Sequence, residues 1–515
     1  MIAQRLIRQR PRLLTTPRLH RPPLPRPRFA STSTSQTSQT SSPSAMWTGV
    51  VSFGAGLGAG WALYRKGKST DAAVSSPPAT VQTPLVASYT PTMTTPDLNE
   101  LGITGQIEYT TPPTLDDVTK QLNEHKFTVR GAPGGVDRYD GAQLASNSPC
   151  EDAFVHGSFS NPFSTRGNDD DRWMAWAVFD GHCGWQLSNL LKTQLMPFVR
   201  RSLARAKPTD KTEVTEEVVH QALKNSFTTL DDALVKSATA IIESDLPFAE
   251  KARRLEPAYA GACALLTLFD PQSRKLHVAS TGDCRAVLGQ KTDDGKWVTK
   301  ALSEDCTGAT PSEIERIKAQ FPDEPNVVQG GRVWGLQPSR TLGDGMWKWT
   351  AELKQNLRHH FNGLSLPSAV RYKDYKEGPY VTAEPLVTTT QIPDPKERPS
   401  FVILATDGLW DTMSSEQAVG LVGRWYDSQQ KGLQVVDPKK SKEDFGPVVL
   451  GWKQQCKYEE RKATFQDDNA AVHLMRNGLG GADEEMVRGA LAFRYPNSRD
   501  IRDDITIQVV FFGPM

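Results

Sequence analysis

Four aspartates stand at the ends of short apolar segments, and their type and placement suit the binding of a divalent cation. In chain order they are Asp180, Asp283, Asp407 and Asp503. Several carboxylates at one place repel one another, and a cation relieves that repulsion without the large pKa shifts that protonation would need. No histidine or cysteine cluster accompanies them, so Mg²⁺ or Mn²⁺, which prefer oxygen ligands, are expected rather than Zn²⁺.

The elements that must position these aspartates are expected to be buried strands. Short runs rich in apolar, aromatic and β-branched residues cover 173–179, 276–280, 401–406 and 505–512. An aspartate follows each of the first three runs and precedes the last. In an antiparallel sheet the start of one strand lies beside the ends of its neighbours, so the four carboxylates can converge on one rim. A single Asp-Gly after a strand is more often a turn, and the prediction depends on the set of four.

The chain has 515 residues and a formal net charge of +1, but its charges are unevenly distributed. Residues 1–70 carry eleven Lys or Arg and no acidic residue, so the rest is acidic by about ten charges. A nucleic-acid-binding domain more often has the opposite sign, and no nucleic-acid partner is expected. The six cysteines form no CxxC pair, and reduced thiols are expected. Cys183 is a candidate nucleophile, but a small filler in a turn is the favoured interpretation.

The N-terminal segment 1–45 has the composition of a mitochondrial transit peptide, because it is rich in Arg, Ser and Thr and has no acidic residue. A disordered basic arm is the alternative. The next segment, 46–64, carries no charge, has aromatic residues near both ends and precedes three basic residues. It is predicted to be a transmembrane anchor in the inner membrane or a sorting signal, with a flexible glycine-rich spacer as the alternative.

A linker is predicted for 65–124, most of which is rich in Pro, Ser and Thr and lacks a sustained apolar period. A folded domain is then expected over 125–515. The N-terminal segments place the protein in the mitochondrion. A matrix enzyme, an enzyme anchored in the inner membrane and an enzyme facing the intermembrane space all remain open.

Seven short motifs resemble, in the same order, those of the metal-dependent type 2C serine/threonine protein phosphatase family. They are SPCED (148–152), VFDGHCG (178–184), YAGACALL (259–266), STGDCRAVLG (280–289), SRTLGD (339–344), ATDGLWD (405–411) and RDDITIQVV (502–510). The resemblance covers about residues 125–515, and the ordered set is far more specific than any single motif. It implies an α+β fold in which a central sandwich of two antiparallel sheets is flanked by α-helices.

The resemblance also implies two Mg²⁺ or Mn²⁺ ions per domain and a weaker third site. Asp180 matches the residue that bridges the two ions, and the carbonyl of Gly181 binds one of them. Asp407 and Asp503 match ligands of the other ion. The remaining matches are Glu151 and Asp152, which act mainly through metal-bound water, and Asp283 and Asp411, which resemble ligands of the third ion.

The reaction implied by the resemblance is hydrolysis of phosphoserine or phosphothreonine by a water molecule that the two cations activate. Besides Asp180, the catalytic residue is His182, which resembles the general acid that protonates the leaving alkoxide. No covalent phosphoenzyme is required, so Cys183 need not react.

Two positions depart from the family pattern. The usual phosphate-binding Arg, four residues before the acidic pair, is replaced here by Asn147. Asn147 is expected to contact the substrate phosphate, but what else holds the phosphate stays open. The usual Asp-Asn pair before the last strand is Asp503-Asp504; the ligand is assigned to Asp503, with Asp504 as its neighbour.

Within the family, the closest resemblance is to pyruvate dehydrogenase phosphatases. It is carried by ASNSPCED (145–152), PYVTAEP (379–385) and DDNAAVHLMRNGLGG (467–481). The implied substrate is a phosphoprotein, the E1α subunit of pyruvate dehydrogenase, whose dephosphorylation would reactivate that complex. One alternative is a mitochondrial phosphatase with other protein substrates. Another is an inactive phosphatase fold that serves as a binding module, against which the retained aspartates argue.

Other residues in these motifs have structural interpretations. Arg340 is expected to be a buried ion-pair partner that orients ligands rather than a substrate contact, and Glu384 is expected to be structural. Trp334, Trp347 and Trp349 are candidates for either a substrate groove or core packing.

Overall fold

The computed structural model describes residues 112–164, 171–207, 214–360, 375–431, 445–448, 450, 456–513 and 515. All of them belong to one compact unit, Ser76–Met515. The segments expected to be a transit peptide and an anchor, 1–45 and 46–64, lie outside the described residues, as does most of the expected linker. Among the described helices, none is both long and apolar enough to cross a membrane.

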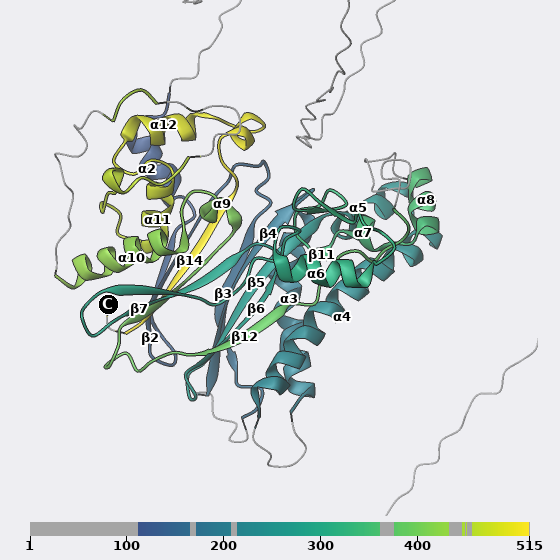
Figure 1. The fold of residues 1–515 in the computed structure, drawn as a ribbon, viewed down its shortest axis with the longest axis horizontal. Coiled ribbons are helices and arrows are strands. Elements are labelled where there is room, and N and C mark those ends of the chain that lie inside the picture. Colours follow the sequence, from purple (N-terminus) through teal and green to yellow (C-terminus); the bar gives the residue numbers. More distant parts are fainter. Residues whose placement is uncertain are drawn as a thin grey trace, which may run out of the picture. The chain divides into compact units, whose positions relative to one another are not determined.

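Two antiparallel sheets form the centre of the domain (Figure 1). The first sheet has the strand order β1-β2-β14-β13-β7-β8. Its strands are β1 (Phe127–Ala132), β2 (Val136–Leu144), β7 (Arg285–Lys291), β8 (Trp297–Ala301), β13 (Ser400–Ala405) and β14 (Ile505–Phe512). The second sheet has the order β12-β6-β5-β4-β3, with β11 paired to β5. Its strands are β3 (Ala153–Ser160), β4 (Arg172–His182), β5 (Gly261–Asp270), β6 (Lys275–Thr281), β11 (Leu342–Gly343) and β12 (Leu386–Gln391).

The sheets pack face to face, which explains why their central strands are continuous apolar runs rather than alternating ones. Along β4, Met174, Trp176 and Val178 join the core between the sheets, whereas the residues between them face the helices. Successive strand residues point to opposite faces, so a strand covered on both sides needs apolar residues at every position. The same division runs along β13.

Helices cover the outer face of each sheet (Figure 1). The second sheet is covered by α3 (Gln186–Arg205) and α4 (Glu216–Glu243), with α5 (Phe248–Tyr259) packed against them. The first sheet is covered by α2 (Leu115–Asn123), α10 (Ser415–Gln430) and α11 (Ala470–Gly478), with α12 (Glu484–Ala492) against α2. The buried residues of α4 recur every three or four positions, as an amphipathic helix requires. The expected α+β sandwich flanked by helices is therefore confirmed.

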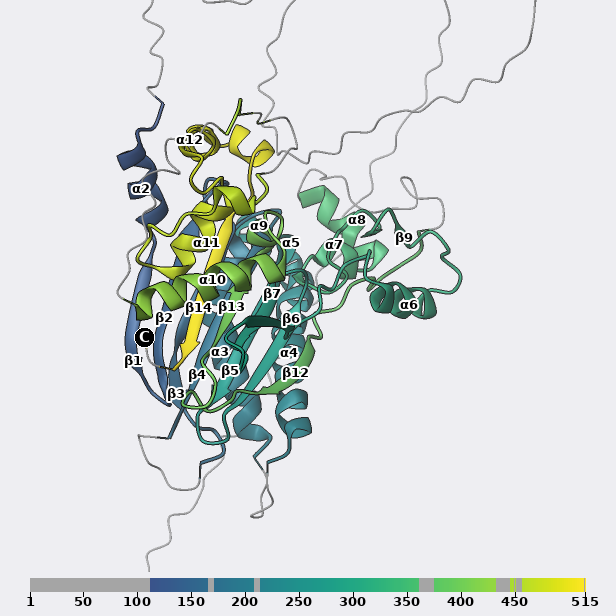
Figure 2. The same ribbon diagram turned by 60° about the vertical axis from the view of Figure 1, so that its left-hand side comes forward.

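A segment between β8 and β12 packs partly around a core of its own and partly against α4 and α5. It contains α6 (Pro311–Gln320), the two-stranded β9 (Val328–Gln329) and β10 (Arg332–Val333), α7 (Gly345–Lys348) and α8 (Ala351–His360). Figure 2 shows α6 and β9 beside the sandwich, away from α10 and α11. Trp334 and Tyr380 are buried in the core of this segment. Three short helices complete the described elements: α9 (Asp407–Trp410), η2 (Glu460–Lys462) and η3 (Asn497–Asp500).

The helix α2 lies on the N-terminal side of the boundary expected at residue 125. Thr114 and Asp117 form a capping box at its start, and Val118 and Leu122 are buried against the first sheet's helices. Packing of these two side chains makes 115–123 part of the domain core.

Candidate metal centre

The end of β4 brings Asp180, Gly181 and His182 to one rim of the sandwich. The strand was expected to end before Asp180, but its pairing with β5 continues through His182, opposite Gly261. A side chain at Gly181 would lie 2.2 Å from the carbonyl oxygen of Glu151. The absence of a Cβ therefore lets the loop of the acidic pair lie directly on the strand end.

Three carboxylates from both sheets converge at this rim. Asp180, Asp283 and Asp407 each offer an oxygen, and these oxygens lie within 4.8 Å of one another. Asp283 lies in the turn between β6 and β7, after Gly282 at a φ of +89°. Asp407 begins α9 directly after β13. Two strands of one sheet and two of the other thus hold side chains that are up to 227 positions apart in the chain.

The carboxylates raise one another's pKa values. Burial is the largest cause for Asp180 and Asp407, and the charges of their acidic neighbours raise both pKa values further. Burial and the charge of Asp504 raise the pKa of Asp152 to about 8, although Thr406 and Thr506 donate hydrogen bonds to it at 2.8 and 2.7 Å. The negative charges of these carboxylates repel one another when no cation is bound. Their oxygens are the ligands that a divalent cation such as Mg²⁺ or Mn²⁺ prefers.

Asp504, treated in the sequence as a neighbour only, organises the loop that carries Asn147 and Glu151. Its carboxylate accepts hydrogen bonds from the backbone N–H groups of Ser146, Asn147 and Glu151. The Asn147 side-chain amide also donates to Asp504 at 2.9 Å and to Glu151 at 3.3 Å. Asp504 is 2% exposed, so its role in the structure is to shape this loop.

Asp503 is not among the three carboxylates whose oxygens lie within 4.8 Å of one another. It forms an ion pair with Arg499, four positions earlier, and accepts a hydrogen bond from the Asp504 N–H at 2.7 Å. The side chains of Asp503 and Arg499 are 30% and 37% exposed. Arg499 belongs to none of the motifs and was not singled out in the sequence.

His182 is held by an acid that the sequence analysis did not single out. Its Nε2 lies 2.8 Å from Oδ2 of Asp344, which is fully buried. Burial alone lowers the pKa of His182, but the charge and hydrogen bond of Asp344, with Asp283 and Glu151, outweigh this and raise it. The protonated form is thereby favoured, as a proton donor requires. Asp344 is the last residue of the SRTLGD motif, and that motif is the sequence feature from which its role could have been predicted.

Cys183 has the positive φ expected of a turn, +58°. Although the residue is partly exposed, desolvation of its thiol and the charges of Asp344 and Glu151 raise its pKa to about 12. The thiolate form is therefore scarce at neutral pH, which argues against a nucleophilic role.

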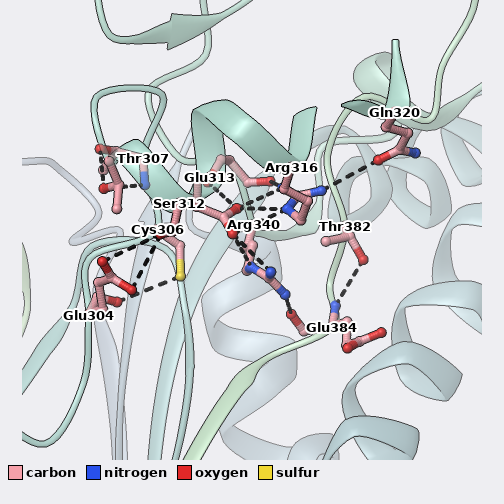
Figure 3. A network of polar contacts seen from close by, with 12 residues as sticks. Glu304, Cys306, Thr307, Ser312, Glu313, Arg316, Gln320, Arg340, Thr382 and Glu384 are labelled. Carbon is pink, nitrogen blue, oxygen red and sulfur yellow. Dashed lines mark hydrogen bonds and ion pairs between the residues drawn. The ribbon is translucent and has the colours of Figure 1, made fainter. Parts of the chain in front are cut away.

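Arg340 is a buried ion-pair partner, as expected, but its partner lies on α6 rather than at the metal centre (Figure 3). Its guanidinium donates to Glu313 at 2.8 and 3.0 Å and to the backbone carbonyl of Glu384 at 2.8 Å. Trp334 and Trp349 are each 3% exposed, which favours core packing over a groove.

Known proteins resemble this chain over most of its length. A Schizosaccharomyces pombe protein described as a protein phosphatase 2C homolog is 38% identical over 408 residues, 78% of this chain and 86% of that protein. The mitochondrial pyruvate dehydrogenase (acetyl-transferring) phosphatase 1 of Saccharomyces cerevisiae is 32% identical over 418 residues, 76% of this chain and 71% of that protein. The Bos taurus protein of the same name is 30% identical over 480 residues, 80% of this chain and 84% of that protein.

The family described as Protein phosphatase 2C matches residues 143–442, more than half of the chain. The match includes the strands β4, β6 and β13, which carry the three converging carboxylates. The chain therefore belongs to the protein phosphatase 2C family of Mg²⁺- or Mn²⁺-dependent protein serine/threonine phosphatases.

Proposed function

We propose that this phosphatase dephosphorylates the E1α subunit of pyruvate dehydrogenase in mitochondria and that its catalytic centre is the acidic rim. The observation that carries the catalytic part is the convergence of Asp180, Asp283 and Asp407 within 4.8 Å. In the described part of the chain, none of the three forms an ion pair with a basic side chain. An external cation is therefore the natural counter-charge for them.

Two cations fit the donor set. Asp180, Asp407, Asp503 and the carbonyl of Gly181 would hold them. When bound, the cations supply positive charge that activates water and offsets the charge of the phosphate. Glu151 and Asp152 would act on the cations through bound water. Asp283 and Asp411 would be ligands of a third, weaker cation site.

The chain's own residues complete the reaction. His182 donates a proton to the serine oxygen as the phosphorus–oxygen bond breaks, because an alkoxide is a poor leaving group without it. Asp344 fixes the ring through the 2.8 Å hydrogen bond and favours its protonated form. Asp504 keeps the Asn147–Glu151 loop against the strand end.

Phosphate release from a phosphoserine peptide tests the catalytic proposal. The purified domain is expected to release phosphate with Mg²⁺ or Mn²⁺, to stop when a chelator is added, and to recover when Mn²⁺ is returned. Activity that is unaffected by the chelator would contradict the metal centre. An absence of activity under every metal condition would favour a binding module instead.

The substrate proposal draws on the relatives whose names include pyruvate dehydrogenase phosphatase, at 30–32% identity. Phosphorylated mitochondrial extract should be compared before and after addition of the active domain. Loss of phosphate from E1α, ahead of other phosphoproteins, is expected. Persistence of E1α phosphorylation while other sites are cleared would support the alternative of other mitochondrial substrates.

The location proposal rests on the basic segment 1–45 and on the mitochondrial relatives. The anchor proposal for 46–64 rests on its uncharged composition alone. Fractionation of mitochondria with protease protection separates the alternatives. A soluble, protected protein indicates the matrix, whereas a membrane-bound protein that is degraded after the outer membrane is opened indicates the intermembrane space.

A further inference from the structure

The loop around Asn147 lacks the positive charge that a phosphate group calls for. The Asn147 amide has two N–H donors, and they point to Asp504 at 2.9 Å and to Glu151 at 3.3 Å. The side chain is neutral and is already occupied by carboxylates. A phosphate dianion approaching this acidic rim therefore needs a cationic protein group from elsewhere, in addition to the metal ions.

Arg499 contacts Asp503, the acid that the proposed function adds to this rim. The two form an ion pair, and the charge of Arg499 also lowers the pKa values of Glu151 and Asp152, against the larger effect of their burial. One side chain therefore lies within electrostatic reach of three acids at the proposed metal centre. The Arg499 side chain is 37% exposed, so it is accessible to a ligand from solution.

The turn that carries Arg499 is fixed to the loop that carries Asn147. The hydroxyl of Ser498 donates to the carbonyl of Ser146 at 2.6 Å, and the hydroxyl of Ser146 donates to the carbonyl of Arg502 at 2.8 Å. Ser498 is fully buried. Arg499 is thus presented beside the position where the family pattern has its phosphate-binding arginine.

Two other arginines near the rim are already committed to other partners. Arg285 forms two hydrogen bonds with Asp305, at 3.0 and 2.6 Å. Arg502 is 5% exposed and donates to the backbone carbonyls of Ala490, Phe493 and Ala145. Neither can turn to a substrate without leaving its bonds, whereas Arg499 has one ion-pair partner that metal binding would draw away.

A groove of about 1180 Å³ is lined by Ser498, the residue before Arg499, although Arg499 itself is not part of its lining. It is bounded by α2 on one side and by the segment before Arg499 on the other, and its lining includes Asn147, Ser148 and Ser498. Phe493 and Tyr495, 38% and 49% exposed, stand along it. The groove is large enough for a stretch of extended chain, so a phosphoserine placed at Arg499 can have its flanking residues in the groove.

We propose that Arg499 binds the phosphate of the substrate and takes the role that Asn147 cannot fill. This inference rests on the proposed function of the rim. Without a cation, the guanidinium neutralises Asp503. Once Asp503 turns to a cation, the planar N–H fork of Arg499 is released to donate to two phosphate oxygens on the same side of the centre.

Three variants test the proposal with p-nitrophenyl phosphate as substrate and inorganic phosphate as inhibitor, in Mn²⁺. Arg499→Gln is expected to raise KM and the phosphate inhibition constant about 10- to 100-fold, with a smaller change in kcat. Arg499→Lys should have a KM and a phosphate inhibition constant between those of the wild type and Arg499→Gln. It keeps the positive charge but loses the paired N–H donors of the guanidinium. Arg254→Gln removes an arginine with the same i,i+4 pairing, to Glu250 on α5, and should leave both constants unchanged.

A second measurement separates phosphate binding from support of the metal site. The Mn²⁺-induced rise in unfolding temperature, measured without phosphate, should be kept or enlarged in Arg499→Gln, because a competitor for Asp503 is gone. The further rise on adding inorganic phosphate to the Mn²⁺-loaded protein should be lost. A parallel loss of the Mn²⁺ response would show that Arg499 merely holds Asp503 in place, and would overturn the proposal.

A wrong role for Arg499 and a wrong proposed function would give different results. If the wild type hydrolyses p-nitrophenyl phosphate and Arg499→Gln retains its phosphate inhibition constant, the role of Arg499 is wrong and the proposed function stands. If the wild type has no activity, the proposed function is wrong. In that case equal stabilisation of both proteins by inorganic phosphate overturns the proposal for Arg499 as well, whereas stabilisation of the wild type alone supports it.

Discussion

Two groups of largely buried acids in this domain differ in whether the fold supplies their counter-charge. At the rim of the sandwich, Asp180 and Asp407 face other carboxylates, and burial together with those charges raises their pKa values. On α6, Glu313 faces the guanidinium groups of Arg316 and Arg340 and the hydroxyl of Ser339 (Figure 3). Burial also acts on Glu313, but these partners outweigh it and lower its pKa to about 2.

The presence or absence of a basic partner distinguishes a structural acid such as Glu313 from the acids of a binding site. An acid with its counter-charge inside the fold, such as Glu313, stabilises the fold and has no further bond to offer. Carboxylates whose neighbours are other carboxylates have no positive counter-charge in the fold. A cation from solution can supply it. Burial alone does not distinguish the two groups, because both are largely inside the protein.

The largest expected effect comes from Asp180→Asn. Removing the proposed bridging carboxylate should lower kcat/KM for a phosphoserine peptide by about 10³-fold or more, because the cations supply most of the charge stabilisation. The Mn²⁺-induced rise in unfolding temperature should disappear. In chelator the variant should be at least as stable as the wild type, since one repelling charge is gone. A variant with wild-type activity would show that the rim acids are not a cation-binding site distinct from Glu313.

Glu313→Gln should lower the stability of the fold without changing the metal centre. Loss of this charge leaves Arg340 buried without its counter-ion, and the free energy of unfolding is expected to fall by about 3 kcal/mol in urea titrations. The Mn²⁺ response should be retained, because the network does not touch the rim. A variant that keeps its stability but loses Mn²⁺ binding would reverse the assignment of the two groups.

Asp344 is an intermediate case, since it is a buried acid whose partner is the catalytic histidine. Asp344→Asn should lower kcat by about 10²-fold, because the ring loses both its orientation and the charge that favours its protonated form. A substrate with a good leaving group, such as p-nitrophenyl phosphate, should be affected much less than a phosphoserine peptide. Equal losses for both substrates would indicate a general structural defect instead.

The pH dependence of stability sharpens the Glu313 comparison. Its folded pKa, about 2, lies below the ordinary 4.5, so its contribution is fully present above pH 4.5 and is lost as the pH falls toward 2. The difference in unfolding free energy between wild type and Glu313→Gln should thus be constant from pH 6 to 5 and shrink below 4.5. A difference that is undiminished at pH 3 would mean that charge is not the cause.

The smallest effect is expected from Cys183→Ser. With a thiol pKa near 12, Cys183 is almost wholly protonated at neutral pH and takes no part in the proposed reaction. Phosphate release should change less than twofold. A loss comparable to that of Asp180→Asn would point to covalent chemistry at this position.

The strands that lead to the rim acids could be predicted because burial on both faces leaves a plain sequence signal, whereas the sandwich itself was implied by the family resemblance. The last strand has the expected bounds, Ile505–Phe512, and the runs that became β6 and β13 differ from expectation by one residue at each end. Helix α2 falls within the segment predicted to be a linker, because that prediction followed the Pro-, Ser- and Thr-rich composition that precedes the helix.

The parts of the site that sequence missed depend on contacts between distant residues. Asp504 shapes a loop more than 350 positions earlier, and no local pattern shows that. Arg499 lies in a polar stretch without periodicity, so only the folded chain shows its contact with Asp503. Whether Asp503 is a metal ligand stays a prediction.

Gly261 has a consequence for how relatives of this protein can be sorted. A methyl group at that position would stand 2.0 Å from Nε2 of His182 and 2.3 Å from Oδ2 of Asp344, and would push the two apart. Any relative with a larger residue there is expected to have lost efficient proton delivery while keeping every carboxylate at the rim. A single glycine can therefore reveal a silenced member of the family that a survey of metal ligands alone would count as active.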